Sequence, residues 1–175
     1  MKIAQISTGF LEVPGQISLN IFTQGCNINC PGCQNQELIP LENENALDYS
    51  CDELLEAIQL YKMPTYICWM GGEPTIWIDE IIKVNEKLHE LGYLICLYTG
   101  KSLYKIYNNY SNLLKTLDLI KIGRYNKISP NLKGSRQFFV SFKYGDKKMF
   151  PVGMTFEKEK LIEEIKKFTE SKRMV

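Results

Sequence analysis

Alternating apolar and polar side chains predict a half-buried strand from Ile17 to Thr23. This strand ends at Gln24-Gly25, immediately before a cysteine. Two more segments, Thr65–Met70 and Tyr93–Tyr98, are rich in β-branched, aromatic and apolar residues and lead into glycine-containing loops. The pattern therefore predicts strands whose carboxyl ends carry irregular loops.

Helical spacing of apolar residues fills the intervals between these strands. Ser50 and Glu53 have the spacing of a capping box, and apolar residues recur every three or four positions from there until Pro64. A second amphipathic pattern begins at Ile78 and ends before Gly92, a residue type typical of a helix end. Weaker patterns predict a helix over Lys101–Tyr110, strands over Leu117–Ile122 and Gln137–Phe142, and a helix over Glu157–Thr169.

The alternation of strands and helices predicts an α/β fold with a mostly parallel sheet. A complete eight-fold β/α barrel needs about 200 residues or more, so a chain of 175 residues can form only a partial (incomplete) β/α barrel. We expect one domain over residues 1–175, because no linker or repeat interrupts the pattern. Ligands of such sheets bind beyond the carboxyl ends of the strands. We therefore expect the cysteine loop, Gly71–Pro74, Thr99-Gly100 and Gly123-Arg124 to face one site.

Composition and charge exclude several classes of partner. The chain has 21 Lys and Arg residues against 20 Asp and Glu residues, and a net charge of +1 gives no broad basic surface for nucleic acid or an anionic membrane. The first residues do not form a secretion signal, and no apolar stretch is long enough to span a bilayer. We therefore expect a cytoplasmic protein that binds neither nucleic acid nor membranes.

Three cysteines, Cys26, Cys30 and Cys33, fall within eight residues. Thiols stay reduced in the cytoplasm, so this cluster indicates a metal centre rather than disulfides. A zinc site would need a fourth ligand, and the only histidine, His89, is expected to be a surface or packing residue of a helix. A cubane [4Fe-4S] cluster held by three cysteines would keep one iron open for chemistry. A zinc-binding module and an electron-transferring iron–sulfur protein remain alternatives.

The other cysteines have simpler explanations. Cys68 and Cys96 lie within apolar strand segments, where a free cysteine behaves as a small hydrophobic residue. Cys51 lies in the first turn of a predicted helix. We expect none of the three to be catalytic. Tyr98, next to Thr99-Gly100, could line the site.

The motif Cys26-x3-Cys30-x2-Cys33 after one strand, with Gly71-Gly72-Glu73-Pro74 after the next, resembles the radical S-adenosylmethionine (SAM) superfamily. The resemblance implies a cluster on the three cysteines whose open iron is chelated by the amino and carboxylate groups of SAM. Gly71 and Gly72 are expected to adopt positive φ and, with the Glu73 carboxylate, to receive the ammonium group of SAM. No residue of the protein is needed as acid, base or nucleophile. The expected cofactor-binding residues are Gly32, Cys33, Gln34, Asn35, Gly71, Gly72, Glu73, Pro74, Thr99 and Gly100.

Within this superfamily the chain looks most like the activating proteins of anaerobic (class III) ribonucleotide reductase. The segments that carry this likeness are Val13–Ser18, Thr23–Cys26, Cys30–Asn35, Gly123–Tyr125 and Gly134–Gln137. The chain departs from the family at Gly32, where an aromatic residue is common, at Ile122, where the family has an acidic residue, and in Gly134–Gln137, which lacks an Asn.

The resemblance implies a reaction and its partners. An electron from flavodoxin or ferredoxin would cleave SAM to methionine and a 5′-deoxyadenosyl radical, which would generate a glycyl radical on the large subunit of the anaerobic reductase. Two alternatives share the early motifs. One is activation of another glycyl-radical enzyme, such as pyruvate formate-lyase, and the other is a small-molecule radical SAM reaction that builds a modified base.

Overall fold

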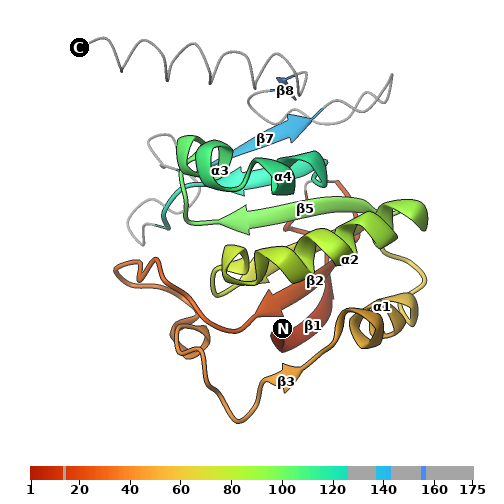
Figure 1. Cartoon of the computed structure of the whole chain (residues 1–175), viewed down its shortest axis with the longest axis horizontal. Coiled ribbons are helices and arrows are strands. Elements are labelled where there is room, and N and C mark those ends of the chain that lie inside the picture. Colours follow the sequence, from red (N-terminus) through yellow and green to blue (C-terminus); the bar gives the residue numbers. More distant parts are fainter. Residues whose placement is uncertain (14, 126–136, 143–154, 157–175) are drawn as a thin grey trace.

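The fold is built around one eight-stranded mixed sheet, described here from a computed structural model (Figure 1). The structure describes residues 1–13, 15–125, 137–142 and 155–156. The order of strands in the sheet is β3-β1-β2-β4-β5-β6-β7-β8. The strands are β1 (Lys2–Gly9), β2 (Ser18–Thr23), β3 (Leu47–Asp48), β4 (Tyr66–Gly71), β5 (Leu94–Thr99), β6 (Leu119–Ile122), β7 (Phe138–Phe142) and β8 (Thr155–Phe156).

The centre of the sheet is parallel, as predicted. Strands β2, β4, β5 and β6 run side by side in the same direction, and residues such as Ile21 and Trp69 face each other across the first of these pairs. Strand β1 pairs antiparallel with β2, and β7 pairs antiparallel with β6. The two edge strands, β3 and β8, do not pair with each other, so the sheet stays open. The α/β fold with a mostly parallel sheet is thus confirmed.

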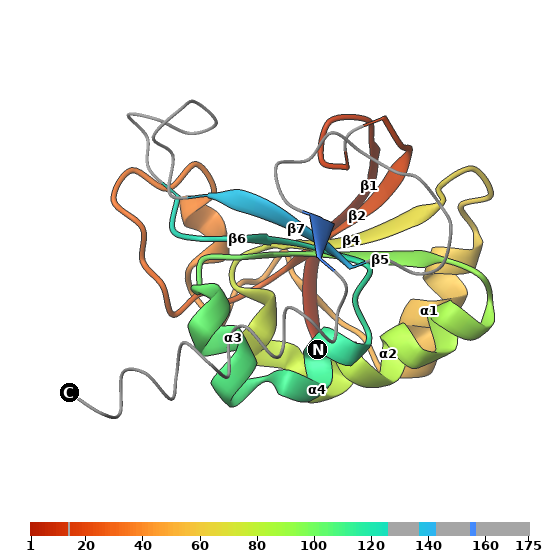
Figure 2. The same ribbon diagram turned by 90° about the horizontal axis from the view of Figure 1, so that it is seen from above.

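All the described α-helices cover one face of the sheet (Figure 2). The Ser50–Glu53 capping box begins α1, and Gly92, with a φ of 86°, follows the end of α2, as predicted. The helix predicted over Lys101–Tyr110 is shorter and is followed by a second helix that the sequence pattern did not indicate. The helix predicted over Glu157–Thr169 lies outside the described residues. The helices are α1 (Cys51–Gln59), α2 (Ile78–Glu90), α3 (Leu103–Asn109) and α4 (Ser111–Lys115), with the 3-10 turns η1 (Gln36–Leu38) and η2 (Pro74–Trp77).

The two faces of the sheet differ in what they bury. Alternate residues of the central strands, including Ile21, Trp69 and Leu97, pack against the helices and are fully buried. The residues between them point to the opposite face, where Cys68 and Cys96 are buried and pair in register. Their burial among Tyr66 and Leu119 agrees with the expected role as small hydrophobic residues.

In the part of the chain that the structure describes, no helix has the length and apolar character needed to cross a bilayer.

Candidate functional site

A cavity of about 330 Å³ lies where the parallel strands end. Strands β2, β4, β5 and β6 or the loops that follow them supply most of its wall, and the loop that holds the cysteines forms one side. The expected site residues that line this cavity are Cys26, Cys30, Cys33, Gln34, Asn35, Gly71, Gly72, Glu73, Thr99 and Gly100. Gly32 and Pro74 were also expected at the site but do not line the cavity, because Gly32 is exposed and Pro74 is buried in η2. The prediction that these distant loops meet is therefore confirmed for most of its members.

The three cysteines are free and half-buried at the edge of the cavity. The loop that carries them is anchored by backbone hydrogen bonds from Gly25 N to Leu38 O and from Cys26 N to Ile39 O. Within the described ranges, no three His, Cys, Asp or Glu side chains converge on a point that could hold a single metal ion. Three cysteine side chains that line one cavity suit a cluster, whose irons are bound at separate corners.

The glycine loop after β4 packs directly on the start of the cysteine loop. Gly71 has a φ of 105°, as expected, but Gly72 has no positive φ, so that expectation was wrong there. Gly72 must be glycine for a different reason, because a Cβ atom would lie 2.0 Å from the carbonyl oxygen of Gly25. Glu73 N also donates to that oxygen at 2.7 Å. The double glycine therefore allows a close contact between β4 and the cysteine loop.

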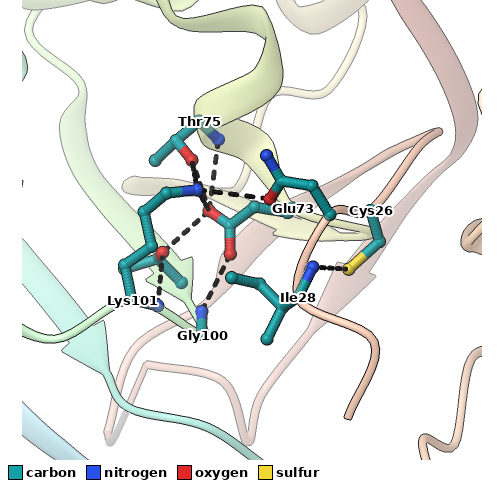
Figure 3. A network of polar contacts seen from close by, with 8 residues as sticks. Cys26, Ile28, Glu73, Thr75, Gly100 and Lys101 are labelled. Carbon is teal, nitrogen blue, oxygen red and sulfur yellow. Dashed lines mark hydrogen bonds and ion pairs between the residues drawn. The ribbon is translucent and has the colours of Figure 1, made fainter. Parts of the chain in front are cut away.

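The carboxylate of Glu73 is buried beside the cavity, with 1% of the residue exposed (Figure 3). Its Oε1 atom accepts hydrogen bonds from the hydroxyl groups of Thr75 and Thr99, each at 2.7 Å, and its Oε2 atom accepts one from Gly100 N at 2.9 Å. The Nζ atom of Lys101 lies 3.8 Å from Oε1. Glu73 thus connects the glycine loop, η2 and the end of β5, and its expected contact with a ligand remains a prediction.

Two further residues line the cavity from adjacent strands, Tyr98 on β5 and Lys121 on β6. The Nζ atom of Lys121 lies 4.7 Å from the centroid of the Tyr98 ring, an arrangement that stabilises a cation. Burial lowers the pKa of Lys121 and raises the pKa of Tyr98. The lining position of Tyr98 was expected, whereas Lys121 was missed. Lys121 lies on the strand predicted over Leu117–Ile122, two positions before Gly123, and this position near the end of a predicted strand could have indicated it.

His89 takes no part in the cavity. Its Nε2 atom lies 2.9 Å from Oδ2 of Asp118, which also accepts a hydrogen bond from Ile95 N. This contact ties α2 to the sheet, so the packing role expected for His89 is confirmed.

Comparisons with known proteins agree with the cysteine and glycine motifs. Residues 13–142 match the family described as 4Fe-4S single cluster domain. The chain is 29% identical over 103 residues to the 7-carboxy-7-deazaguanine synthase of Methanospirillum hungatei, covering 57% of this chain and 42% of that protein. It is 25% identical over 122 residues to the pyruvate formate-lyase-activating enzyme of Streptococcus mutans, covering 65% of this chain and 46% of that protein. The chain thus matches less than half of the length of each.

The fold has a counterpart among solved structures. The crystal structure of QueE from Escherichia coli superposes with a TM-score of 0.51 at 17% sequence identity, covering 71% of this chain and 72% of that chain. That likeness extends to the α/β architecture and its mostly parallel mixed sheet. The family match covers most of the chain, including all three clustered cysteines and the glycine loop, and this family implies a [4Fe-4S] cluster and SAM as cofactors. The chain belongs to the 4Fe-4S single cluster domain family, within the radical SAM superfamily.

Proposed function

We propose that this chain is a radical SAM activase that generates a glycyl radical on anaerobic ribonucleotide reductase. The observation that carries the proposal is the cavity in which the three clustered cysteines face the glycine loop and the ends of β5 and β6. The pyruvate formate-lyase-activating enzyme among the relatives supports an activase function. The order of the segments from Val13 to Gln137 favours the reductase as target.

The donor set fits the cluster. Cys26, Cys30 and Cys33 would bind three of its irons, since all three thiols are free and reach the cavity. No fourth cysteine lines the cavity among the described residues, so one iron would remain for SAM. When bound, the cluster and SAM supply an electron and a 5′-deoxyadenosyl radical, chemistry that no side chain of the protein can supply.

The remaining residues would bind and orient SAM. We assign the carbonyl groups of Gly71 and Gly72 to its ammonium group. Glu73 would receive the same ammonium group through Oε2, because a carboxylate oxygen that already accepts from Gly100 N can accept a second hydrogen bond. Gln34, Asn35, Thr99 and Gly100 would complete the wall around the nucleoside and methionine parts. Gly32 and Pro74 would act by shaping the loops that carry these residues.

The proposed protein substrate is the large subunit of the anaerobic reductase. Flavodoxin or ferredoxin would supply the electron. A glycine-bearing segment of the reductase would enter the cavity, whose lining includes the uncharged residues Ile28, Ile39 and Met70. Neither nucleic acid nor a membrane has a part in this reaction.

One observation favours a second candidate. The similarity to 7-carboxy-7-deazaguanine synthase points to a small-molecule radical SAM reaction. In that case the chain would cleave SAM without producing a glycyl radical on a protein. The two non-enzymatic alternatives differ in their metal, since a zinc module would contain neither iron nor sulfide and an electron carrier would be indifferent to SAM.

The experiment starts from anaerobically reconstituted protein mixed with SAM, reductant and a class III reductase. We expect 5′-deoxyadenosine, measured by chromatography, and a glycyl radical signal in the electron paramagnetic resonance (EPR) spectrum. Cys30→Ala should abolish both, whereas Cys51→Ala, which changes a half-buried cysteine outside the cavity, should abolish neither. Formation of 5′-deoxyadenosine with no radical on any glycyl-radical enzyme would favour the small-molecule reaction.

A further inference from the structure

The side chain of Arg124 is bound to the segment between the first two clustered cysteines. Its Nη2 atom donates to the carbonyl oxygen of Ile28 at 2.5 Å and to that of Asn29 at 3.2 Å. These residues lie between Cys26 and Cys30, and Arg124 follows β6, almost a hundred positions along the chain. A guanidinium group donates strong, charge-assisted hydrogen bonds to such oxygens. Arg124 therefore joins the end of β6 to the cysteine loop.

The backbone before Arg124 is itself held in place. Gly123 has a φ of 104°, a conformation that favours glycine. Its N–H group donates to the carbonyl oxygen of Lys101, and its own carbonyl oxygen accepts from the side-chain amide of Gln137, both at 3.1 Å. The turn that presents Arg124 to the cysteine loop is thus held by a residue that follows β5 and by the residue that precedes β7.

The segment that Arg124 holds contains a residue in the left-handed region of backbone conformation. Asn29 is the one described residue other than glycine with a positive φ, at 50°. The neighbouring Ile28 packs closely on Gly100. A Cβ atom added to Gly100 would lie 2.9 Å from the Ile28 side chain. Lys101 Nζ donates to Oδ1 of Asn27 at 3.4 Å. The loop is therefore held at the successive residues Asn27, Ile28 and Asn29, and Arg124 binds the last two.

We propose that Arg124 is a positioning residue that keeps Cys26 and Cys30 arranged for the cluster through its hydrogen bonds to Ile28 and Asn29. This inference rests on the proposed role of the three cysteines as cluster ligands. It gives a role to the Gly123-Arg124 sequence and to Gln137, which the proposed reaction leaves without one. Both hydrogen bonds come from one guanidinium nitrogen, so the effect depends on where the guanidinium group is placed.

The test compares iron loss from the reconstituted full chain and from its variants. Wild type, Arg124→Met and Arg124→Lys are mixed anaerobically with a ferrous-iron chelator, and the decay of the cluster absorbance is followed. We expect both variants to lose iron about tenfold faster, the change in rate that corresponds to about 1.4 kcal/mol. Lys105→Met, which removes an exposed cation from α3, should match wild type. The EPR spectrum of the reduced cluster should also change in both Arg124 variants and not in Lys105→Met.

Each result is decisive. Equal rates of iron loss for wild type and Arg124→Met would overturn the inference while leaving the proposed function intact. Wild-type behaviour of Arg124→Lys would show that the guanidinium group is not needed at this position, which also overturns it. Melting curves of the cluster-free proteins separate this role from general stability, since we expect them to coincide. If the wild-type chain binds no cluster at all, the proposed function itself is wrong, and this inference fails with it.

Discussion

The Nζ atom of Lys101 lies 3.8 Å from Oε1 of Glu73, and these side chains are only 10% and 1% exposed. The same ammonium group donates to the hydroxyl of Thr75 at 2.6 Å. A buried carboxylate that loses its cation is strongly destabilised, because water cannot replace the lost partner. This pair therefore stabilises the junction of the glycine loop and β5.

We expect Lys101→Met to lower the free energy of unfolding by about 3 kcal/mol, since it leaves the buried Glu73 charge without its cation. Urea denaturation of the cluster-free chain measures this change. The matched control is Lys87→Met, which breaks an exposed pair with Glu90 on α2 and should cost about 0.5 kcal/mol or less. Equal effects of the two substitutions would contradict the importance given to the buried pair.

Gly72→Ala should lower the free energy of unfolding by about 3 kcal/mol, because the new Cβ would overlap a backbone oxygen that cannot move aside. That oxygen belongs to Gly25, 2.0 Å from the Cβ position. Gly92→Ala is the control, since Gly92 has a φ of 86° but no atom within 4 Å of its Cβ position, and the strain alone should cost about 1 kcal/mol. The prediction fails if Gly92→Ala is the more damaging of the two.

Stability should fall at alkaline pH, in part through Cys68. Burial raises the pKa of the Cys68 thiol well above its ordinary value of 9.0, so the folded chain keeps this proton while the unfolded chain releases it. The stabilisation is complete below pH 9.0 and is lost progressively as the pH rises above that value. Urea denaturation across this range should show a steeper loss for wild type than for Cys68→Ala. Identical pH profiles would rule out a contribution from Cys68.

Local patterns predicted the elements that depend on neighbouring residues. The sequence pattern predicted the capping box at Ser50, the glycine at the helix end, Gly92, and the buried strand containing Cys96. Each of these features depends on residues close in sequence. Strand β1 (Lys2–Gly9) was missed. Its residues are mostly only partly buried, so their side chains give a weak period, and its place depends on antiparallel pairing with β2.

The same difference between local features and long-range contacts applies to the site. The cysteine and glycine motifs identified the residues around the cavity, because each motif is contiguous in the chain. The partners of Glu73 could not be read in this way, since Thr99, Gly100 and Lys101 meet it only when β4 and β5 align. The contact of Arg124 with Ile28 likewise depends on the folded sheet.

The most direct test of the central claim is the EPR spectrum of the anaerobically reconstituted and reduced protein, recorded with and without SAM. A cluster held by Cys26, Cys30 and Cys33 alone has one iron that SAM can bind, so we expect the spectrum to change when SAM is added. A spectrum that SAM leaves unchanged would contradict the account.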